Sequence, residues 1–136
     1  MSEKYYDQMR KRITAANAKF KKARPATFEG FNMLHGEVAA EDGRHLDPKI
    51  KEIIALAISV SERCDPCIAF HARAALRNGA TREEIMDMLT VVVMMGGGPA
   101  LMYCAHVVEV LDWTRSSATA DARVEVRVSA AAGPTH

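Results

Sequence analysis

The sequence predicts an all-α fold, a single-domain bundle of about six helices. Apolar residues recur at spacings of three and four through most of the chain, which is the periodicity of one helix face. Proline stands near the start of several of these stretches, and Gly-containing turns follow others, as helix boundaries require. The chain has 136 residues, of which 49% are hydrophobic, and this is enough for one packed core.

Two helices are expected before residue 40. Residues 3–24 carry apolar side chains at helical spacing, and Arg24-Pro25 ends this helix. Its other face is rich in Lys and Arg, which is typical of a solvated face, although a basic arm that docks on a partner is the alternative. The second helix is expected over residues 26–39, where we interpret His35 as an ordinary surface or interface histidine.

A third helix is expected over residues 48–60, with Asp47-Pro48 as its cap. Its buried positions are predicted to be Ile50, Ile53, Ile54, Ala57 and Ile58. Glu52 falls beside this apolar face, where an unpaired carboxylate would be costly to desolvate. Glu52 therefore pairs with another group, reaches solvent, or has a raised pKa suited to general-base chemistry.

A fourth helix is expected after the short turn at residues 61–63. Asp65 is predicted as its N-cap, and Pro66 suits the first turn because it has no N–H to leave unpaired. Asn78 and Gly79 form the expected C-terminal stop.

Two thiols and an imidazole share one face of this predicted helix. Cys64 and Cys67 are three residues apart and His71 follows four later, so they form one stripe if the helix begins near Cys64. The positive end of the helix macrodipole should lower the pKa of these thiols, an effect that Asp65 opposes. A dithiol that can close to a disulfide beside a proton-transfer group is the outline of a redox site.

Three other interpretations of this stripe stay open. A zinc site would need a fourth ligand, from Cys104, His106 or elsewhere, and zinc motifs usually pair two separated ligand clusters. A purely structural disulfide across a two-residue gap would constrain very little chain. The third interpretation is a core pair of cysteines with an incidental histidine.

Two more helices are expected, one before and one after the run Gly96-Gly97-Gly98-Pro99. Thr81 and Glu84 form a capping box for the fifth helix, residues 82–95, which becomes apolar nearly all round and should be central. The glycine run lacks the Gly-Lys-Ser/Thr ending of a phosphate-binding loop. We therefore interpret it as a sharp break or a close packing of backbones. The sixth helix is expected over residues 99–113.

We make separate predictions for two side chains of the sixth helix. Cys104 lies on an apolar segment and is interpreted as a buried small hydrophobe. His106 is assigned a packing or interface role, with an approach to the thiols from a neighbouring helix as the alternative.

The chain divides into an N-terminal helical arm, residues 1–25, a helical domain, residues 26–113, and a C-terminal extension, residues 114–136, that is partly extended or disordered. Within the extension, residues 124–128 alternate valine with polar side chains, which predicts a short strand. Residues 130–136 are expected to form a disordered tail.

Charge and composition exclude several classes of partner. The formal net charge of +1 argues against nucleic acid or an acidic membrane. No apolar run reaches the ~20 residues of a membrane span, and polar sequence follows Met1, so the cysteines indicate a reducing cytoplasm. A helix that is apolar nearly all round leaves surplus apolar surface in so small a domain, and this predicts a homo-oligomer.

Glu52 lies twelve residues before Cys64 and completes a pattern Glu-x11-Cys-x2-Cys-x3-His. This pattern resembles the alkyl hydroperoxidase D-like branch of the carboxymuconolactone decarboxylase family. The similarity spans roughly residues 26–113 and extends through residues 46–49, 55–57, 71–75, 79–85 and 96–100. The best-known member of the family has a further histidine directly before the second cysteine, where this chain has Pro66. The other branch, the true lactone decarboxylases, usually lacks the cysteine pair.

The resemblance implies a role for each residue of the pattern. Cys67 would attack a peroxide or a disulfide, and Cys64 would close the disulfide and accept electrons from a donor. His71 and Glu52 would relay protons through water. The resemblance implies no cofactor other than the redox-active Cys64–Cys67 disulfide.

The function implied is that of a thiol-dependent antioxidant oxidoreductase with peroxidase activity of the peroxiredoxin type. Its partners would be a hydroperoxide or disulfide substrate, an external dithiol or lipoyl-type reductant protein, and further copies of the chain in a trimer or hexamer. Neither nucleic acid nor a membrane is implied. The alternatives are a protein disulfide reductase without peroxidase activity, a lyase like carboxymuconolactone decarboxylase with His71 and Glu52 as acid and base, and a non-catalytic metal-binding or oligomeric scaffold.

Overall fold

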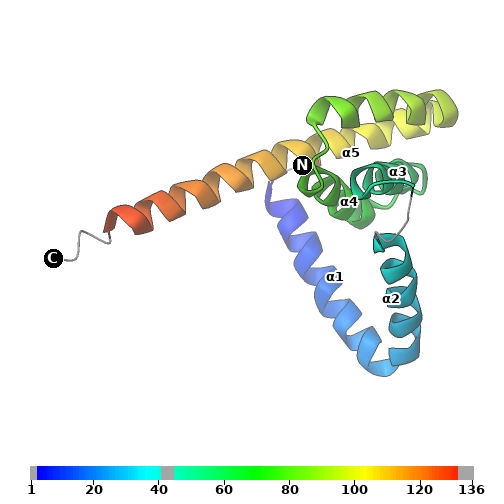
Figure 1. Cartoon of the computed structure of the whole chain (residues 1–136), viewed down its shortest axis with the longest axis horizontal. Helices are drawn as coiled ribbons and strands as arrows, with labels where there is room; N and C mark the ends of the chain where they lie inside the picture. Colours follow the sequence, from blue (N-terminus) through cyan, green and yellow to red (C-terminus); the bar gives the residue numbers. More distant parts are fainter. Residues whose placement is uncertain (1–2, 41–44, 132–136) are drawn as a thin grey trace.

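The computed structural model describes residues 3–40 and 45–131, and every regular element within these ranges is an α-helix (Figure 1). The helices are α1 (Glu3–Ala23), α2 (Pro25–Ala39), α3 (Pro48–Ser61), α4 (Asp65–Arg77) and α5 (Arg82–Ala131). The prediction of an all-α fold is therefore confirmed.

The predicted fifth and sixth helices are the two arms of α5, which meet at the glycine run. Gly97 has φ 65° and ψ −150°, a non-helical conformation, and the chain changes direction there (Figure 1). This backbone region is essentially restricted to glycine because a side chain would collide with the neighbouring peptide groups. The predicted break is thus confirmed, and one residue produces it.

Gly97→Ala is expected to lower the free energy of unfolding by roughly 1–3 kcal/mol, because alanine strains this backbone conformation. Gly98→Ala is the matched control, since Gly98 has no positive φ and an added Cβ meets no atom within 4 Å. Urea unfolding of both variants measures the difference. Equal stability of the two variants would show that the Gly97 conformation is not required.

Local capping signals position the starts of α3 and α5. The Asp47 side chain accepts a hydrogen bond from the backbone N–H of Ile50 at 2.9 Å. The N–H of Thr81 donates to Glu84 Oε2 at 2.9 Å, and the N–H of Glu84 donates to Thr81 Oγ1 at 3.1 Å. Both predicted caps are therefore confirmed, as is the Gly79 stop after α4, where φ is 92°.

The core lies where α3, α4 and both arms of α5 pack together, and the first turns of α1 close it. Its largest fully buried side chains are Tyr6, Leu56, Val60, Ile68, Ile85, Val107 and Val110. The first arm of α5 buries Ile85, Leu89 and Val92 in the core. The prediction that it is central fails at its end, where Val91, Met94 and Met95 are 54%, 74% and 80% exposed.

The predicted buried face of α3 is confirmed for Ile53 and Ala57, which pack against the core, and wrong for the other three isoleucines. Ile50, Ile54 and Ile58 are 37%, 44% and 56% exposed, whereas Leu56 and Val60 are fully buried. Helix α3 is apolar on both sides, so its periodicity alone does not decide which side α4 and α5 cover. The exposed isoleucines form one stripe, because spacings of four place them on the same side of the helix.

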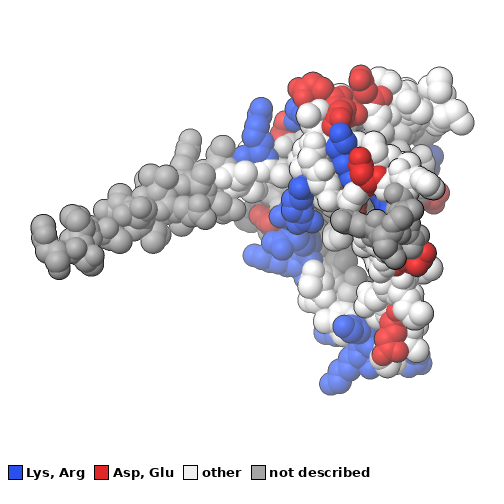
Figure 2. All heavy atoms as spheres, in the orientation of Figure 1, with Lys and Arg blue, Asp and Glu red and all other residues white. Residues whose placement is uncertain are grey.

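Helices α1 and α2 form an arm that projects from the rest of the molecule (Figure 1). α2 buries none of its residues, and among residues 5–23 of α1 only Tyr6 and Met9 are buried. The Lys and Arg side chains described on α1 are exposed, and Figure 2 shows basic side chains gathered over α1. This exposure agrees with the interpretation of that face as solvated.

The predicted strand at residues 124–128 is wrong, because these residues continue α5 as a helix to Ala131. A lone strand would have no neighbour with which to pair its backbone groups, whereas a helix satisfies them within the segment. Residues 132–136 of the predicted tail lie outside the described residues.

One stretch of the described chain, Arg82–Ala118, is long and apolar enough to be a candidate membrane span by length and composition alone. This corrects the expectation that no stretch is apolar enough. Gly97 interrupts this stretch, and 22% of its apolar window is buried inside the described structure, with Ile85, Val107 and Val110 fully buried. The stretch thus contributes to the core on one side and is exposed on the other, where Met94, Met95 and Met102 lie.

Candidate redox-active site

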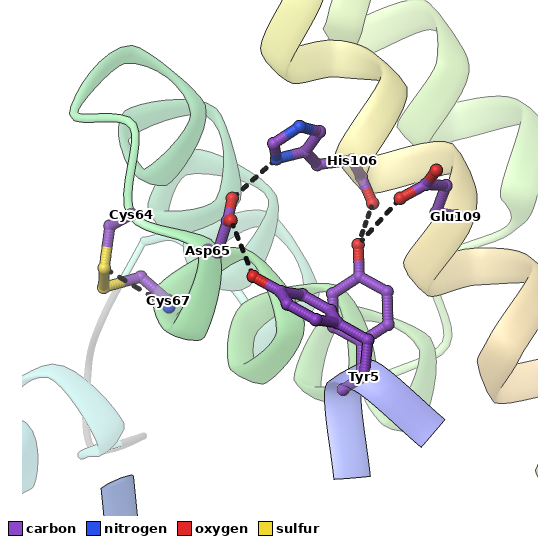
Figure 3. Close-up of polar contacts among 7 residues, drawn as sticks. Tyr5, Cys64, Asp65, Cys67, His106 and Glu109 are labelled. Carbon is purple, nitrogen blue, oxygen red and sulfur yellow. Dashed lines mark hydrogen bonds and ion pairs between the residues drawn. A yellow bond between two sulfur atoms is a disulfide. The ribbon is translucent and has the colours of Figure 1, made fainter. Parts of the chain in front are cut away.

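The two cysteines lie at the start of α4 and form a disulfide with a Cα–Cα distance of 5.2 Å, within the usual range for such bonds (Figure 3). Cys64 is the N-cap, and its Sγ accepts a hydrogen bond from the backbone N–H of Cys67 at 3.3 Å. The prediction of Asp65 as N-cap is therefore wrong by one residue. Asp65 instead occupies the first turn, where its carboxylate has a partner on another helix.

Glu52 of α3 reaches the imidazole of His71 on α4. Glu52 Oε2 lies 2.7 Å from His71 Nδ1, and the two side chains are 26% and 21% exposed. Of the three situations expected for Glu52, the structure therefore shows pairing. A carboxylate on Nδ1 holds the ring in one orientation, stabilises an imidazolium and leaves Nε2 available for proton transfer.

A cavity of about 390 Å³ lies beside this pair, between α2, α3 and α4. Glu52 and His71 line it together with His35 of α2, which is exposed, as expected of a surface or interface histidine, but also borders this cavity. The centres of the His35 and Phe70 rings are 6.5 Å apart, and the centres of the Phe70 and His71 rings are 5.0 Å apart. No local pattern could have revealed this, because only the path of the chain brings α2 to α4.

A second imidazole–carboxylate pair lies on the other side of the start of α4. Asp65 Oδ1 is 2.6 Å from His106 Nδ1, and the hydroxyl of Tyr5 donates to Asp65 Oδ2 at 3.5 Å. Figure 3 shows the Asp65 carboxylate turned toward His106 and away from the disulfide. Of the alternatives for His106, the structure supports packing between helices rather than an approach to the sulfurs.

Cys104 is a free, buried cysteine, as predicted, and burial raises the pKa of its thiol. It takes no part in the disulfide of α4. The described part of the chain contains no group of three or more His, Cys, Asp or Glu side chains placed to hold a metal ion.

Tyr6 joins α1 to the second arm of α5. Its hydroxyl donates hydrogen bonds to the backbone oxygen of His106 at 3.3 Å and to Glu109 Oε2 at 3.2 Å. Burial and then the Glu109 carboxylate raise the pKa of Tyr6 well above its usual value of 10.0. The folded chain therefore holds the proton of Tyr6 more tightly than the unfolded chain does.

The free energy of unfolding is expected to fall as the pH rises above about 10, because the unfolded chain then loses the Tyr6 proton first. Tyr6→Phe should be less stable at neutral pH but should show a flatter dependence above pH 10. Chemical unfolding at several alkaline pH values measures this, with Tyr5→Phe as the control. An unchanged alkaline slope in Tyr6→Phe would assign the dependence to another group.

Residues 25–110 match the sequence profile of the carboxymuconolactone decarboxylase family. An uncharacterized protein of Cupriavidus necator is 36% identical over 107 residues, which cover 76% of this chain and 93% of that protein. Among solved structures, lpg0406 of Legionella pneumophila, a protein of the same family, is 42% identical with a TM-score of 0.73 and covers 82% of this chain and 96% of its own.

A second family member of known structure is TM1620 of Thermotoga maritima, whose description suggests involvement in an antioxidative response. It is 29% identical, has a TM-score of 0.61, and covers 69% of this chain and 94% of its own. With the match of residues 25–110 and these relatives, the chain belongs to the carboxymuconolactone decarboxylase family.

Proposed function

We propose that this chain is a thiol-dependent peroxidase of the antioxidant type, in which Cys64 and Cys67 cycle between dithiol and disulfide. The observation that carries the proposal is the disulfide at the start of α4, one helical turn before the His71–Glu52 pair. The suggested antioxidative role of the Thermotoga relative supports it.

The proposed first step is attack of the Cys67 thiolate on one oxygen of the hydroperoxide. The O–O bond breaks, Cys67 becomes a sulfenic acid, and the other oxygen leaves as an alcohol after taking a proton from His71. The Cys64 thiolate then attacks the Cys67 sulfur, and hydroxide leaves and is protonated to water as the disulfide forms. An external dithiol, free or on a lipoyl-type protein, supplies two electrons and two protons to reduce the disulfide.

In this scheme His71 transfers the protons, and Glu52 assists by stabilising the protonated imidazole ring of His71. The carboxylate of Glu52 stabilises the imidazolium that forms when His71 takes the proton of a thiol. The histidine that the best-known relative carries before its second cysteine is replaced by Pro66, so we assign proton transfer to His71 alone.

We further propose that the active form is a cytoplasmic homo-oligomer, a trimer or a hexamer. The exposed stripe of Ile50, Ile54 and Ile58 on α3 is the apolar surface that a second copy would cover. A reducing compartment fits the scheme because each turnover ends with an oxidised dithiol that a donor must reduce.

Thiol titration with and without hydroperoxide tests the proposal. The reduced chain should give three thiols in denaturant, and one equivalent of hydroperoxide should remove two of them and leave Cys104. Mass spectrometry should then find the Cys64–Cys67 bond. If hydroperoxide leaves all three thiols while a disulfide substrate oxidises two, the chain is a disulfide reductase. Lactone decarboxylation that survives Cys64→Ser would instead indicate a lyase.

A further inference from the structure

A second cavity, of about 370 Å³, lies between α1, α4 and the second arm of α5. It shares no lining residue with the cavity beside Glu52 and His71. Its apolar lining comes from Met9, Ile13, Ala69, Phe70 and Trp113. The volume falls within the range of pockets that hold small organic ligands, roughly 300–1,000 Å³.

The charged groups of this cavity are all of one sign. Arg10, Arg73 and Arg77 line it, and no Asp or Glu does. Arg10 has an exposed ion pair with Asp7 at 3.6 Å. No ion pair between described side chains involves Arg73 or Arg77, and the Arg73 guanidinium lies 5.1 Å from the centre of the Trp113 ring. Two guanidinium groups beside an apolar pocket therefore lack a carboxylate partner in the described part of the chain.

We propose that this cavity binds an amphipathic carboxylate, a small acid with an aliphatic or aromatic body. Its apolar body would contact Met9, Ile13 and Trp113, and its carboxylate would accept hydrogen bonds from Arg73 and Arg77. Guanidinium groups suit this role because their planar donors match the two oxygens of a carboxylate. A neutral apolar molecule would leave the charged groups unmatched, and a bare inorganic anion would leave the apolar lining uncovered.

Trp113 provides the measurement, because it is the chain's single tryptophan and it lines the cavity. The oxidised full-length protein is titrated with octanoate while tryptophan fluorescence is recorded, and octanol and inorganic phosphate are titrated in parallel. We expect a saturable change with octanoate and at least tenfold weaker binding of the other two. Because Cys67→Ser cannot form the disulfide, it is compared with the reduced wild type. Equal octanoate binding by these two proteins would make this result independent of the redox proposal.

Arg77→Gln and Arg73→Gln are each expected to raise the dissociation constant for octanoate roughly tenfold. Arg73→Gln also alters the surroundings of Trp113, whose fluorescence is the signal, so the test depends on the Arg77 variant. Arg12→Gln is the matched control, since Arg12 is exposed on α1 outside the cavity, and it should bind normally. The proposal is overturned by an absence of saturation, by octanol or phosphate binding as tightly as octanoate, or by unchanged binding in Arg77→Gln.

Discussion

Replacing Cys67 with serine is expected to lower kcat/KM for hydroperoxide by roughly 10³-fold or more. A serine hydroxyl is not ionised at neutral pH and cannot become a sulfenic acid, so both the nucleophile and the intermediate are lost. Peroxide consumption with a small dithiol as reductant measures the change. Because Cys67 N–H is the group that binds Cys64 Sγ, the backbone at this position should be unaffected by the substitution.

Two further cysteine variants serve as controls for this experiment. Cys104→Ser should keep nearly full activity, because Cys104 takes no part in the Cys64–Cys67 disulfide and burial raises the pKa of its thiol. Cys64→Ser should still reduce one equivalent of hydroperoxide and should accumulate the sulfenic acid on Cys67, since no resolving thiol remains. A sulfenic acid that forms on Cys64 in the Cys67→Ser variant at the wild-type rate would reverse the assigned roles.

The second large effect is expected at the proton relay. Glu52→Gln and His71→Gln should each lower kcat/KM by roughly 10²-fold. Glutamine at position 71 transfers no proton, and glutamine at position 52 keeps a hydrogen-bonding side chain but has no charge to stabilise the imidazolium of His71. The double variant should be little worse than either single variant, since the two groups act as one unit through the contact of 2.7 Å.

The chain offers a matched control for the relay in the second imidazole–carboxylate pair. His106→Gln removes an equivalent contact, that with Asp65 at 2.6 Å, on the side of α4 away from the disulfide. It should therefore keep most of the activity while it lowers stability. Equal losses in His106→Gln and His71→Gln would mean that neither pair is specific to proton transfer. Fully additive effects of the Glu52 and His71 substitutions would show that the two groups act separately.

The features that the sequence predicted well depend on residues within about one helical turn. The Asp47 cap, the Thr81–Glu84 capping box and the Gly79 stop are contacts or conformations of this kind, and all three are present. The Gly97 break is similar, because its cause is the absence of a side chain at one position. Short-range rules suffice for these features because their energies do not depend on the rest of the fold.

The errors occurred where two local choices were nearly equal. Helix α3 is apolar on two sides, and its periodicity did not show that Leu56 and Val60 would face the core instead of Ile50 and Ile54. By sequence, either Cys64 or Asp65 could serve as the N-cap of α4. In the structure Cys64 is the N-cap, and the Asp65 carboxylate instead contacts His106. For both the buried side of α3 and the N-cap of α4, the observed arrangement includes contacts with residues that are distant in the sequence.

By itself, the sequence determined the helices and the stripe of Cys64, Cys67 and His71 along one of them, because helical periodicity is a property of the local chain. Only the tertiary structure decided which groups surround that stripe. It brought Glu52 to His71, placed His35 in the same cavity, and lined a second cavity with Trp113 and three arginines. These contacts join segments from different helices, and their geometry follows from how the helices pack, which no local pattern encodes.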